Sequence, residues 1–133
     1  MTRHQSRVNA FLLAFQLPSN SLPLEEIVSE SAGELELETD EFCELILKNT
    51  LENLEDIDGA VSPHLKNWSL VRLPRVSLAV LRISCAQIFY MKDIPLSVVI
   101  NEAVEIAKEY GDEEEYSFVN GVLRSVADRL GLE

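Results

Sequence analysis

Apolar residues recur at helical spacing along most of this chain, which predicts helices rather than strands. In residues 3–17 they fall at i, i+3, i+4 and i+7, the positions of Val8, Phe11, Leu12 and Phe15. Pro18 is expected to end this helix, because a proline disfavours helical backbone in the residue before it. A short second helix is expected from Pro23 toward Ala32, with the proline in its first turn.

A third, longer helix is predicted after residue 38. Either Thr39 or Asp40 can cap it, because both side chains accept hydrogen bonds from free backbone N–H groups. Its spaced positions are Phe42, Leu45, Ile46, Asn49 and Leu54. The helix is expected to continue toward Leu65, with a bend or an end at Pro63. Residues 66–72 are expected to form a loop.

The most hydrophobic helix is predicted between Leu73 and Met91, with Pro74 at its start. Its apolar side chains almost encircle the helix axis: Val76, Ala79, Val80, Ile83, Ala86, Ile88 and Phe89. A helix that is apolar on all sides is buried among other elements. This segment is therefore expected at the centre of a helical bundle.

Two further helices are predicted after this central one. Pro95 suits the first turn of the next helix, and Gly111 suits its C-cap. The acids of residues 112–115 open the last helix, where the helix dipole favours negative charge. Its apolar spacing continues across Asn120 and Gly121, a pair that elsewhere favours a hairpin turn. Glycine inside a helix costs about 1 kcal/mol relative to alanine, so a closely packed neighbouring helix is expected at Gly121.

Length and composition fit one all-α domain over residues 1–133. Hydrophobic residues make up 47% of the chain, enough for a folded core despite the charge. No apolar run reaches the roughly eighteen residues that suggest a membrane span, and no signal peptide is recognisable. Cys43 and Cys85 are far apart in sequence and lie among apolar residues. They are expected to be buried and reduced, which favours the cytoplasm.

Charge is segregated along the chain. The formal net charge is −12, yet residues 59–92 hold no acid. That window carries Lys66, Arg72, Arg75, Arg82 and Lys92. The first 24 residues likewise hold Arg3, His4 and Arg7 and no acid. This distribution predicts a cationic face on an acidic protein.

The side chains that carry catalysis are sparse. Neither of the two histidines, His4 and His64, has a cysteine or carboxylate at metal-ligand spacing. The five glycines are scattered singly, so the chain has no phosphate-cradling loop. No serine occurs in a nucleophile-elbow sequence. We therefore expect no enzyme, no catalytic residues, no metal site and no cofactor.

Anion binding has better support, at the first helix. Arg3 and Arg7 are four residues apart and share one side, with His4 beside them. Ala10 and Ala14 continue that side with small residues, which is expected to leave both guanidinium groups unobstructed. A planar guanidinium can bond two phosphate oxygens at once. The first helix is therefore a candidate phosphate-binding surface.

Several longer motifs resemble the NusB family of bacterial transcription antitermination factors. In the C-terminal half they are Val80–Ile83, Ile94–Pro95, Val99–Lys108 and Phe118–Leu123. The first helix agrees more loosely, through Arg3, Arg7, Ala10 and the Phe15–Gln16 pair. The resemblance implies an all-α fold of about seven helices in two packed helical subdomains. It also implies binding of the boxA element of nascent RNA together with NusE, a ribosomal small-subunit protein, which keeps RNA polymerase processive.

The resemblance places RNA contacts on the first helix. Arg3 and Arg7 match basic positions of the family, and His4 occupies a position where arginine is common. A histidine is mostly uncharged near neutral pH, which should weaken the contact. The second acid-free window adds candidates for the same face, namely Lys66, Arg72, Arg75 and Lys92. Arg82 lies in the family's Leu-Arg-Ile pattern and is expected to be structural and paired.

Three positions depart from the family on the face expected to meet NusE. The family often has Tyr-Glu where this chain has Ala86-Gln87, and some members have an acid at the position of Arg124. These changes remove negative charge opposite a basic partner. The resemblance therefore predicts weaker ion pairing with NusE, or a compensating change in that partner.

Two alternatives remain open. One is a protein-only adaptor of the same fold whose RNA face has decayed. The other is the NusB-type domain at the front of ribosomal-RNA cytosine methyltransferases, against which the lack of a cofactor-binding domain after Glu133 argues. Salt distinguishes the antitermination factor from the adaptor, since about three neutralised phosphates would give a log–log slope near −2.

Overall fold

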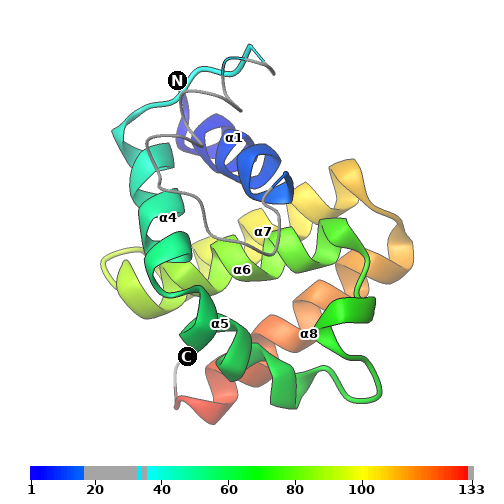
Figure 1. The fold of residues 1–133 in the computed structure, drawn as a ribbon. Helices are drawn as coiled ribbons and strands as arrows, with labels where there is room; N and C mark the ends of the chain where they lie inside the picture. Colours follow the sequence, from blue (N-terminus) through cyan, green and yellow to red (C-terminus); the bar gives the residue numbers. More distant parts are fainter. Residues whose placement is uncertain (17–32, 34–35, 132–133) are drawn as a thin grey trace.

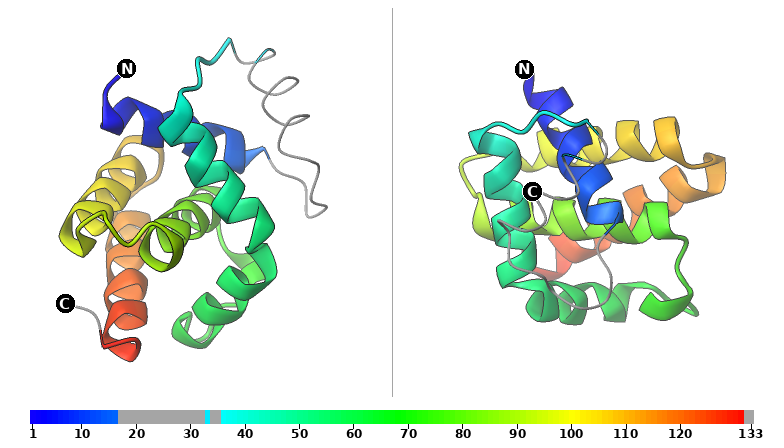
Figure 2. Two further views of the ribbon diagram at one scale, coloured as in Figure 1. Left: turned by 90° about the vertical axis from the view of Figure 1, so that its left-hand side faces the viewer. Right: turned by 45° about the horizontal axis from the view of Figure 1, so that its top comes forward.

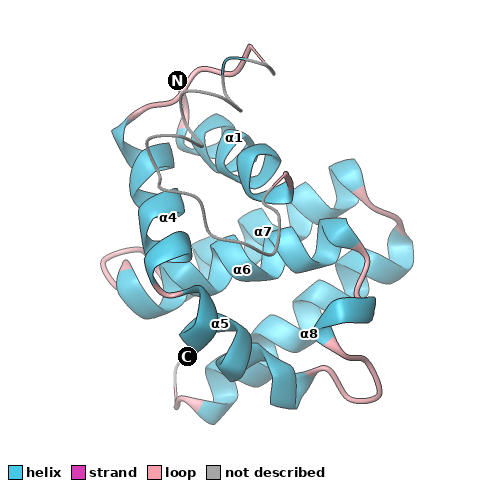
Figure 3. Ribbon diagram, viewed as in Figure 1, coloured by secondary structure: helices cyan, strands magenta, loops and turns pink. Residues whose placement is uncertain are grey.

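A computed structural model describes residues 1–16, 33 and 36–131, and the expected helix at 23–32 lies outside this range. The described residues contain α-helices and short 3-10 helices but no strand (Figure 3). The α-helices are α1 (Arg3–Phe15), α4 (Glu41–Glu52), α5 (Leu54–Val61), α6 (Arg75–Tyr90), α7 (Leu96–Tyr110) and α8 (Glu113–Arg129). The 3-10 helices are η2 (Ser62–His64) and η3 (Leu70–Arg72). The all-α prediction is confirmed.

Helix α6 lies at the centre of the bundle, as its apolar circumference predicted (Figure 1). It packs against α1 and α4 on one side and against α7 and α8 on the other. Figure 2 shows these two groups from further directions, with α1 crossing close to α4. The fold thus consists of two helical groups that share α6, which agrees with the expected pair of packed subdomains.

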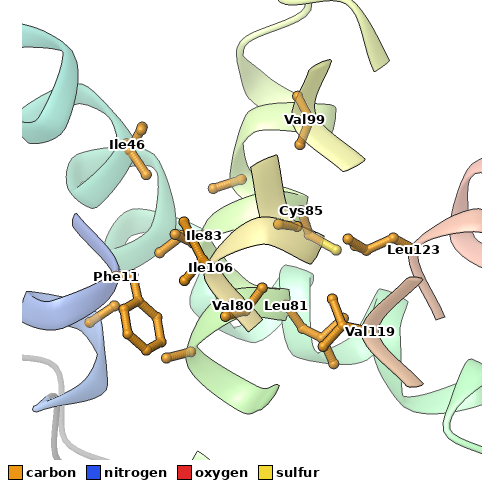
Figure 4. Packing of buried hydrophobic residues seen from close by; sticks show 14 of the residues in the cluster. Phe11, Ile46, Val80, Leu81, Ile83, Cys85, Val99, Ile106, Val119 and Leu123 are labelled. Atoms are coloured by element: carbon orange, nitrogen blue, oxygen red, sulfur yellow. The ribbon is translucent and has the colours of Figure 1, made fainter. Parts of the chain in front are cut away.

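The core continues through α6 from one helical group to the other. Figure 4 shows Phe11 of α1 beside Ile83 of α6, and Cys85 of α6 beside Leu123 of α8. Each of these four side chains is at most 1% exposed. The two helical groups therefore share one continuous hydrophobic core. Burying each large apolar side chain in that core contributes roughly 1.5–3 kcal/mol to the stability of the fold.

The predicted third helix is two helices. Asp40 is its N-cap, with the side chain accepting a 2.8 Å hydrogen bond from the backbone N–H of Cys43. The helix breaks at Asn53, where φ is −121° and ψ is 22°, so the prediction of one helix toward Leu65 is wrong at this point. Beyond the break α5 runs through Gly59 to Val61. Pro63 then falls in η2, where a tighter turn accommodates the ring.

Helices α6 and α7 each begin directly after a proline. Pro74 and Pro95 are the N-caps of α6 and α7, so each precedes the first helical turn by one residue. Gly111 is the C-cap of α7, as predicted. Asp112 and Glu115 then form a capping box at the start of α8, because each side chain accepts a hydrogen bond from the other residue's backbone N–H. The acidic run at 112–115 therefore has the helix-starting role that the sequence predicted.

Gly121 contradicts the prediction of a closely packed neighbour. Helix α8 does run straight through it, but the residue is exposed. In the described part of the chain, a Cβ built there meets no atom of another element within 4 Å. Gly121 lines an open groove with His64 and Ser125, whose Nδ1 and Oγ atoms lie 2.7 Å apart. Packing among the described residues therefore does not explain this glycine.

Replacing Gly121 with alanine is consequently expected to stabilise the protein. Alanine is favoured in a helix by about 1 kcal/mol over glycine, and no clash opposes it. Thermal unfolding should show a midpoint a few degrees higher. Gly111→Ala is the opposing control, because its Cβ would lie 2.9 Å from the carbonyl oxygen of Ala107. A lower midpoint for Gly121→Ala would reveal a packing role that the structure does not contain.

The two cysteines are buried and unpaired, as predicted. Burial raises the pKa of both the Cys43 and the Cys85 thiols to about 12. Protonated thiols are weak nucleophiles at neutral pH.

Among the described residues, no helix is long and apolar enough to cross a membrane.

Candidate nucleic-acid interface

Arg3 and Arg7 lie on the same side of α1, as their spacing predicted. Both guanidinium groups lie over the ring of Phe42 in α4, with centroid distances of 4.0 Å for Arg3 and 5.0 Å for Arg7. Cation–π contacts of this kind contribute about 0.5–1 kcal/mol at exposed sites and more where water is excluded. Phe42 thus holds the arginine side of α1 against α4.

Arg7 is nevertheless buried, with only 4% of the residue exposed. Its Nε donates a 2.8 Å hydrogen bond to Oε1 of Gln87 in α6, whose Nε2 in turn donates to the carbonyl oxygen of Ile83. Burial lowers the pKa of Arg7, and the nearby Glu102 carboxylate opposes that shift. The prediction that Arg7 contacts RNA directly is therefore corrected: in this structure its side chain is part of the packing between α1 and α6.

The small residues after Arg7 explain why it is buried. Ala10 and Ala14 are 0% and 6% exposed, so this side of α1 packs inward. The expectation that they leave the guanidinium groups unobstructed is wrong, because short side chains here allow neighbouring helices to approach. Only Arg3, one turn nearer the N-terminus, remains exposed.

Two carboxylates from outside the acid-free window reach the first turns of α1. Nδ1 of His4 lies 2.6 Å from Oε2 of Glu102 in α7. The hydroxyl of Ser6 donates a 2.6 Å hydrogen bond to Oδ2 of Asp40. The Ser6 hydrogen bond lowers the pKa of Asp40, as do the Cys43 backbone N–H and the charge of Arg3. The charges of Arg3 and Arg7 in these turns are thus matched by the charges of two carboxylates. The separation of basic and acidic residues along the sequence is therefore not kept at this end of α1 in the folded structure.

Arg75 lies at the opposite end of α1 from Arg3. Its guanidinium donates a 2.7 Å hydrogen bond to the carbonyl oxygen of Phe15 and lies 4.3 Å from the centroid of that ring. The helix between Arg3 and Phe15 is roughly 18 Å long, from 1.5 Å per residue. Arg75 therefore extends the basic residues along α1, whereas Arg72 lies exposed in η3.

Arg82 is structural, as expected. Its Nε and one terminal nitrogen donate to the two carboxylate oxygens of Asp58 in α5, at 3.0 and 2.8 Å. The Arg82 and Asp58 side chains are 15% and 21% exposed. This two-pronged ion pair joins α5 to the central helix and leaves Arg82 unavailable to a phosphate.

The residues predicted to meet NusE differ in their exposure to solvent. Ala86 and Gln87 are 0% and 2% exposed, because they lie on sides of α6 that face the interior of the bundle. Their assignment as direct partner contacts is therefore corrected. Arg124 is exposed on α8, where its Nε donates to Oδ1 of Asn120 at 3.1 Å.

An apolar and acidic groove was missed by the sequence analysis. It lies between the loop before α6 and the start of α8, with a volume of about 360 Å³, and Trp68 at its edge is 52% exposed. Its lining residues are Trp68, Leu73, Pro74, Ser77, Asp112, Glu114, Glu115 and Phe118. Val71, in the same loop, is 94% exposed. The sequence offered one signal for this groove, the single tryptophan of the chain in a predicted loop. The groove itself could not be predicted, because Trp68 and the acids at 112–115 are far apart in sequence.

Metal ligands do not gather in the part of the chain that the structure describes. No group of three or more histidine, cysteine, aspartate or glutamate side chains there could hold an ion. The arrangement is suited to binding through arginine, aromatic and carboxylate groups.

Comparison with known proteins identifies the family. The NusB family profile matches residues 4–128. The transcription antitermination protein NusB of Lysinibacillus sphaericus is 40% identical over 97% of this chain and 99% of its own length. The structure of T. maritima NusB is 36% identical, with a TM-score of 0.82 over 96% of this chain and 92% of that one. A structure of the antitermination factors NusB and NusE with double-stranded RNA is 25% identical, with a TM-score of 0.83 over 96% of both chains. This chain therefore belongs to the NusB family.

Proposed function

We propose that this chain is a transcription antitermination factor that binds boxA-type nascent RNA together with NusE. The family relationship over nearly the whole chain carries the proposal, and a similar protein is known bound to NusE and RNA. In this role it keeps RNA polymerase processive indirectly, through the assembled complex. It acts in the cytoplasm as a single binding domain over residues 1–133 and catalyses no reaction.

The proposed RNA face has two parts, one at each end of α1, with Arg3 at the start of the helix and Arg75 beside its last residue, because most of the residues between them are buried. Arg3 is exposed and lies over Phe42, which fixes its guanidinium in one place. Arg75 is fixed in the same way by Phe15, and Arg72 is exposed close by in sequence. Arginines that are held by a ring lose less entropy when they bind a phosphate. His4 lies in the first turn of α1 and completes the face.

The groove beside Trp68 is the proposed protein-binding surface. NusE, a ribosomal protein, is expected to be basic, and the groove offers it Asp112, Glu114 and Glu115 around an apolar floor. Exposed Trp68 and Val71 supply the large apolar contacts that dominate interface energies. Arg124 is the proposed NusE contact retained from the sequence analysis.

Arg3→Ala tests the RNA face. Loss of one phosphate contact should weaken binding of labelled single-stranded boxA RNA several-fold and reduce the magnitude of the log–log salt slope by about 0.7. Arg129→Ala removes the same charge from an exposed position in the last turn of α8 and is the matched control. Equal effects of the two substitutions would show that net charge, rather than a site on α1, governs the affinity.

One observation favours the alternative of a protein-only adaptor. The carboxylates of Asp40 and Glu102 balance the arginines at the start of α1, which weakens the attraction for a polyanion. If wild-type protein binds NusE but its RNA affinity is undetectable even at low salt, the adaptor is the correct function.

A further inference from the structure

We propose that Glu102 of α7 is an internal anion that competes with RNA phosphate for the start of α1. This inference rests on the proposed RNA-binding function and assigns an affinity-limiting role to a residue outside both acid-free windows. Glu102 comes to α1 only through the packing of α7 beside it.

The contact between Glu102 and His4 is direct. Oε2 of the carboxylate lies 2.6 Å from Nδ1 of the imidazole, within hydrogen-bonding distance. The His4 and Glu102 side chains are 44% and 26% exposed, so the pair lies at the surface of the candidate RNA face. The Glu102 charge also reaches the guanidinium of Arg7. One carboxylate thus acts on two of the three basic side chains in the first turns.

The Glu102 carboxylate changes the net charge that His4 presents to an approaching phosphate. Alone, His4 contributes zero charge when neutral and one positive charge when protonated. Paired with Glu102, the two groups together contribute minus one or zero. The pair therefore never adds positive charge to the face, and its nitrogen already has an oxygen ligand of the kind that a phosphate would supply.

Glu102 differs from the other acid at this end of α1. Asp40 caps α4 through the backbone N–H of Cys43, so its carboxylate has a structural role. Within the described part of the chain, the only hydrogen bond of the Glu102 carboxylate is the one to His4. The Glu102 carboxylate therefore caps no helix, and the main expected effect of its charge is on the affinity of this surface for anions.

Glu102→Gln removes the charge and keeps the size and hydrogen-bonding capacity of the side chain. Single-stranded boxA RNA should bind about three times more tightly at low salt, because one repulsive charge several ångströms from the phosphate is lost. The log–log salt slope should also steepen by as much as about 0.7, as a further phosphate engages the released His4 at the start of α1. Both quantities can be obtained from one fluorescence titration series.

Glu105→Gln is the matched control. It removes the same charge from the same helix, three residues on, where the side chain is 61% exposed and lies 3.8 Å from Lys108. We expect a smaller gain in affinity and an unchanged slope. Thermal unfolding of both variants checks that each retains the fold.

The possible outcomes separate this inference from the proposed function. Equal gains for the two variants, or weaker RNA binding by Glu102→Gln, would overturn the competitor role while leaving RNA binding intact. Weaker binding would instead identify Glu102 as a residue that positions His4 for phosphate. If none of the three proteins binds RNA at any salt concentration, the proposed function fails, and the competitor role fails with it.

Discussion

Replacing Arg7 with alanine is expected to lower the free energy of unfolding by about 3 kcal/mol, because it removes one partner from a buried polar pair. The Nε of Arg7 donates to Gln87, which lies 2% exposed inside the central helix. Without the arginine, Oε1 of Gln87 loses its partner, and the aliphatic stem of Arg7 leaves a cavity between α1 and α6. Urea unfolding of the purified variant measures the loss directly.

Arg3→Ala is the control for this stability effect. It removes an identical charge one helical turn away, from an exposed side chain that shares the Phe42 ring. Its expected cost is about 0.5–1 kcal/mol, the value of an exposed cation–π contact. The double variant Arg7→Met with Gln87→Leu should recover part of the stability, since removing both polar partners avoids an unsatisfied group. If Arg7→Ala were as stable as Arg3→Ala, the contact between Arg7 and Gln87 would have no stabilising role.

Loss of the Arg82–Asp58 pair is expected to cost about 2 kcal/mol of unfolding free energy. Both side chains are mostly buried, and removing one leaves the other charge without its partner. The pair is two-pronged, so Arg82→Lys should restore only part of the loss, because an ammonium group cannot reproduce the planar fork.

A double-mutant cycle isolates this interaction. Arg82→Ala, Asp58→Ala and the combined variant should give a coupling energy of at least about 1 kcal/mol in urea unfolding, as contacting residues do. RNA affinity should be unchanged once folding is accounted for, since Arg82 is not on the α1 face. A coupling energy near zero would contradict the structural role assigned to the pair.

The helices were largely predictable because their signals are local. The apolar circumference of α6 and the acids at 112–115 depend on nearby residues alone, and both predictions are confirmed. The break at Asn53 could not be foreseen, since asparagine is tolerated in helices and the apolar spacing continues to Leu54. The prediction at Gly121 failed for a related reason: the energetic cost of a glycine is local, but no packing contact among the described residues accounts for its presence.

The candidate site was less predictable because it depends on which elements meet. Spacing placed Arg3 and Arg7 on one side of α1 but could not show that this side turns toward Gln87 and the core. Acid-free windows describe neighbours in sequence, whereas Asp40 and Glu102 become neighbours of α1 only through folding. Carry-over from the family likewise assigned Ala86 to a surface that lies inside the bundle.

The most direct test of the proposed function is a titration of labelled boxA RNA with the full chain, with and without NusE from the same organism. We predict that NusE tightens RNA binding at least about tenfold and that RNA tightens NusE binding by the same factor, because coupling between two sites is reciprocal. The absence of RNA binding both with and without NusE would contradict the antitermination function and leave a protein-only adaptor.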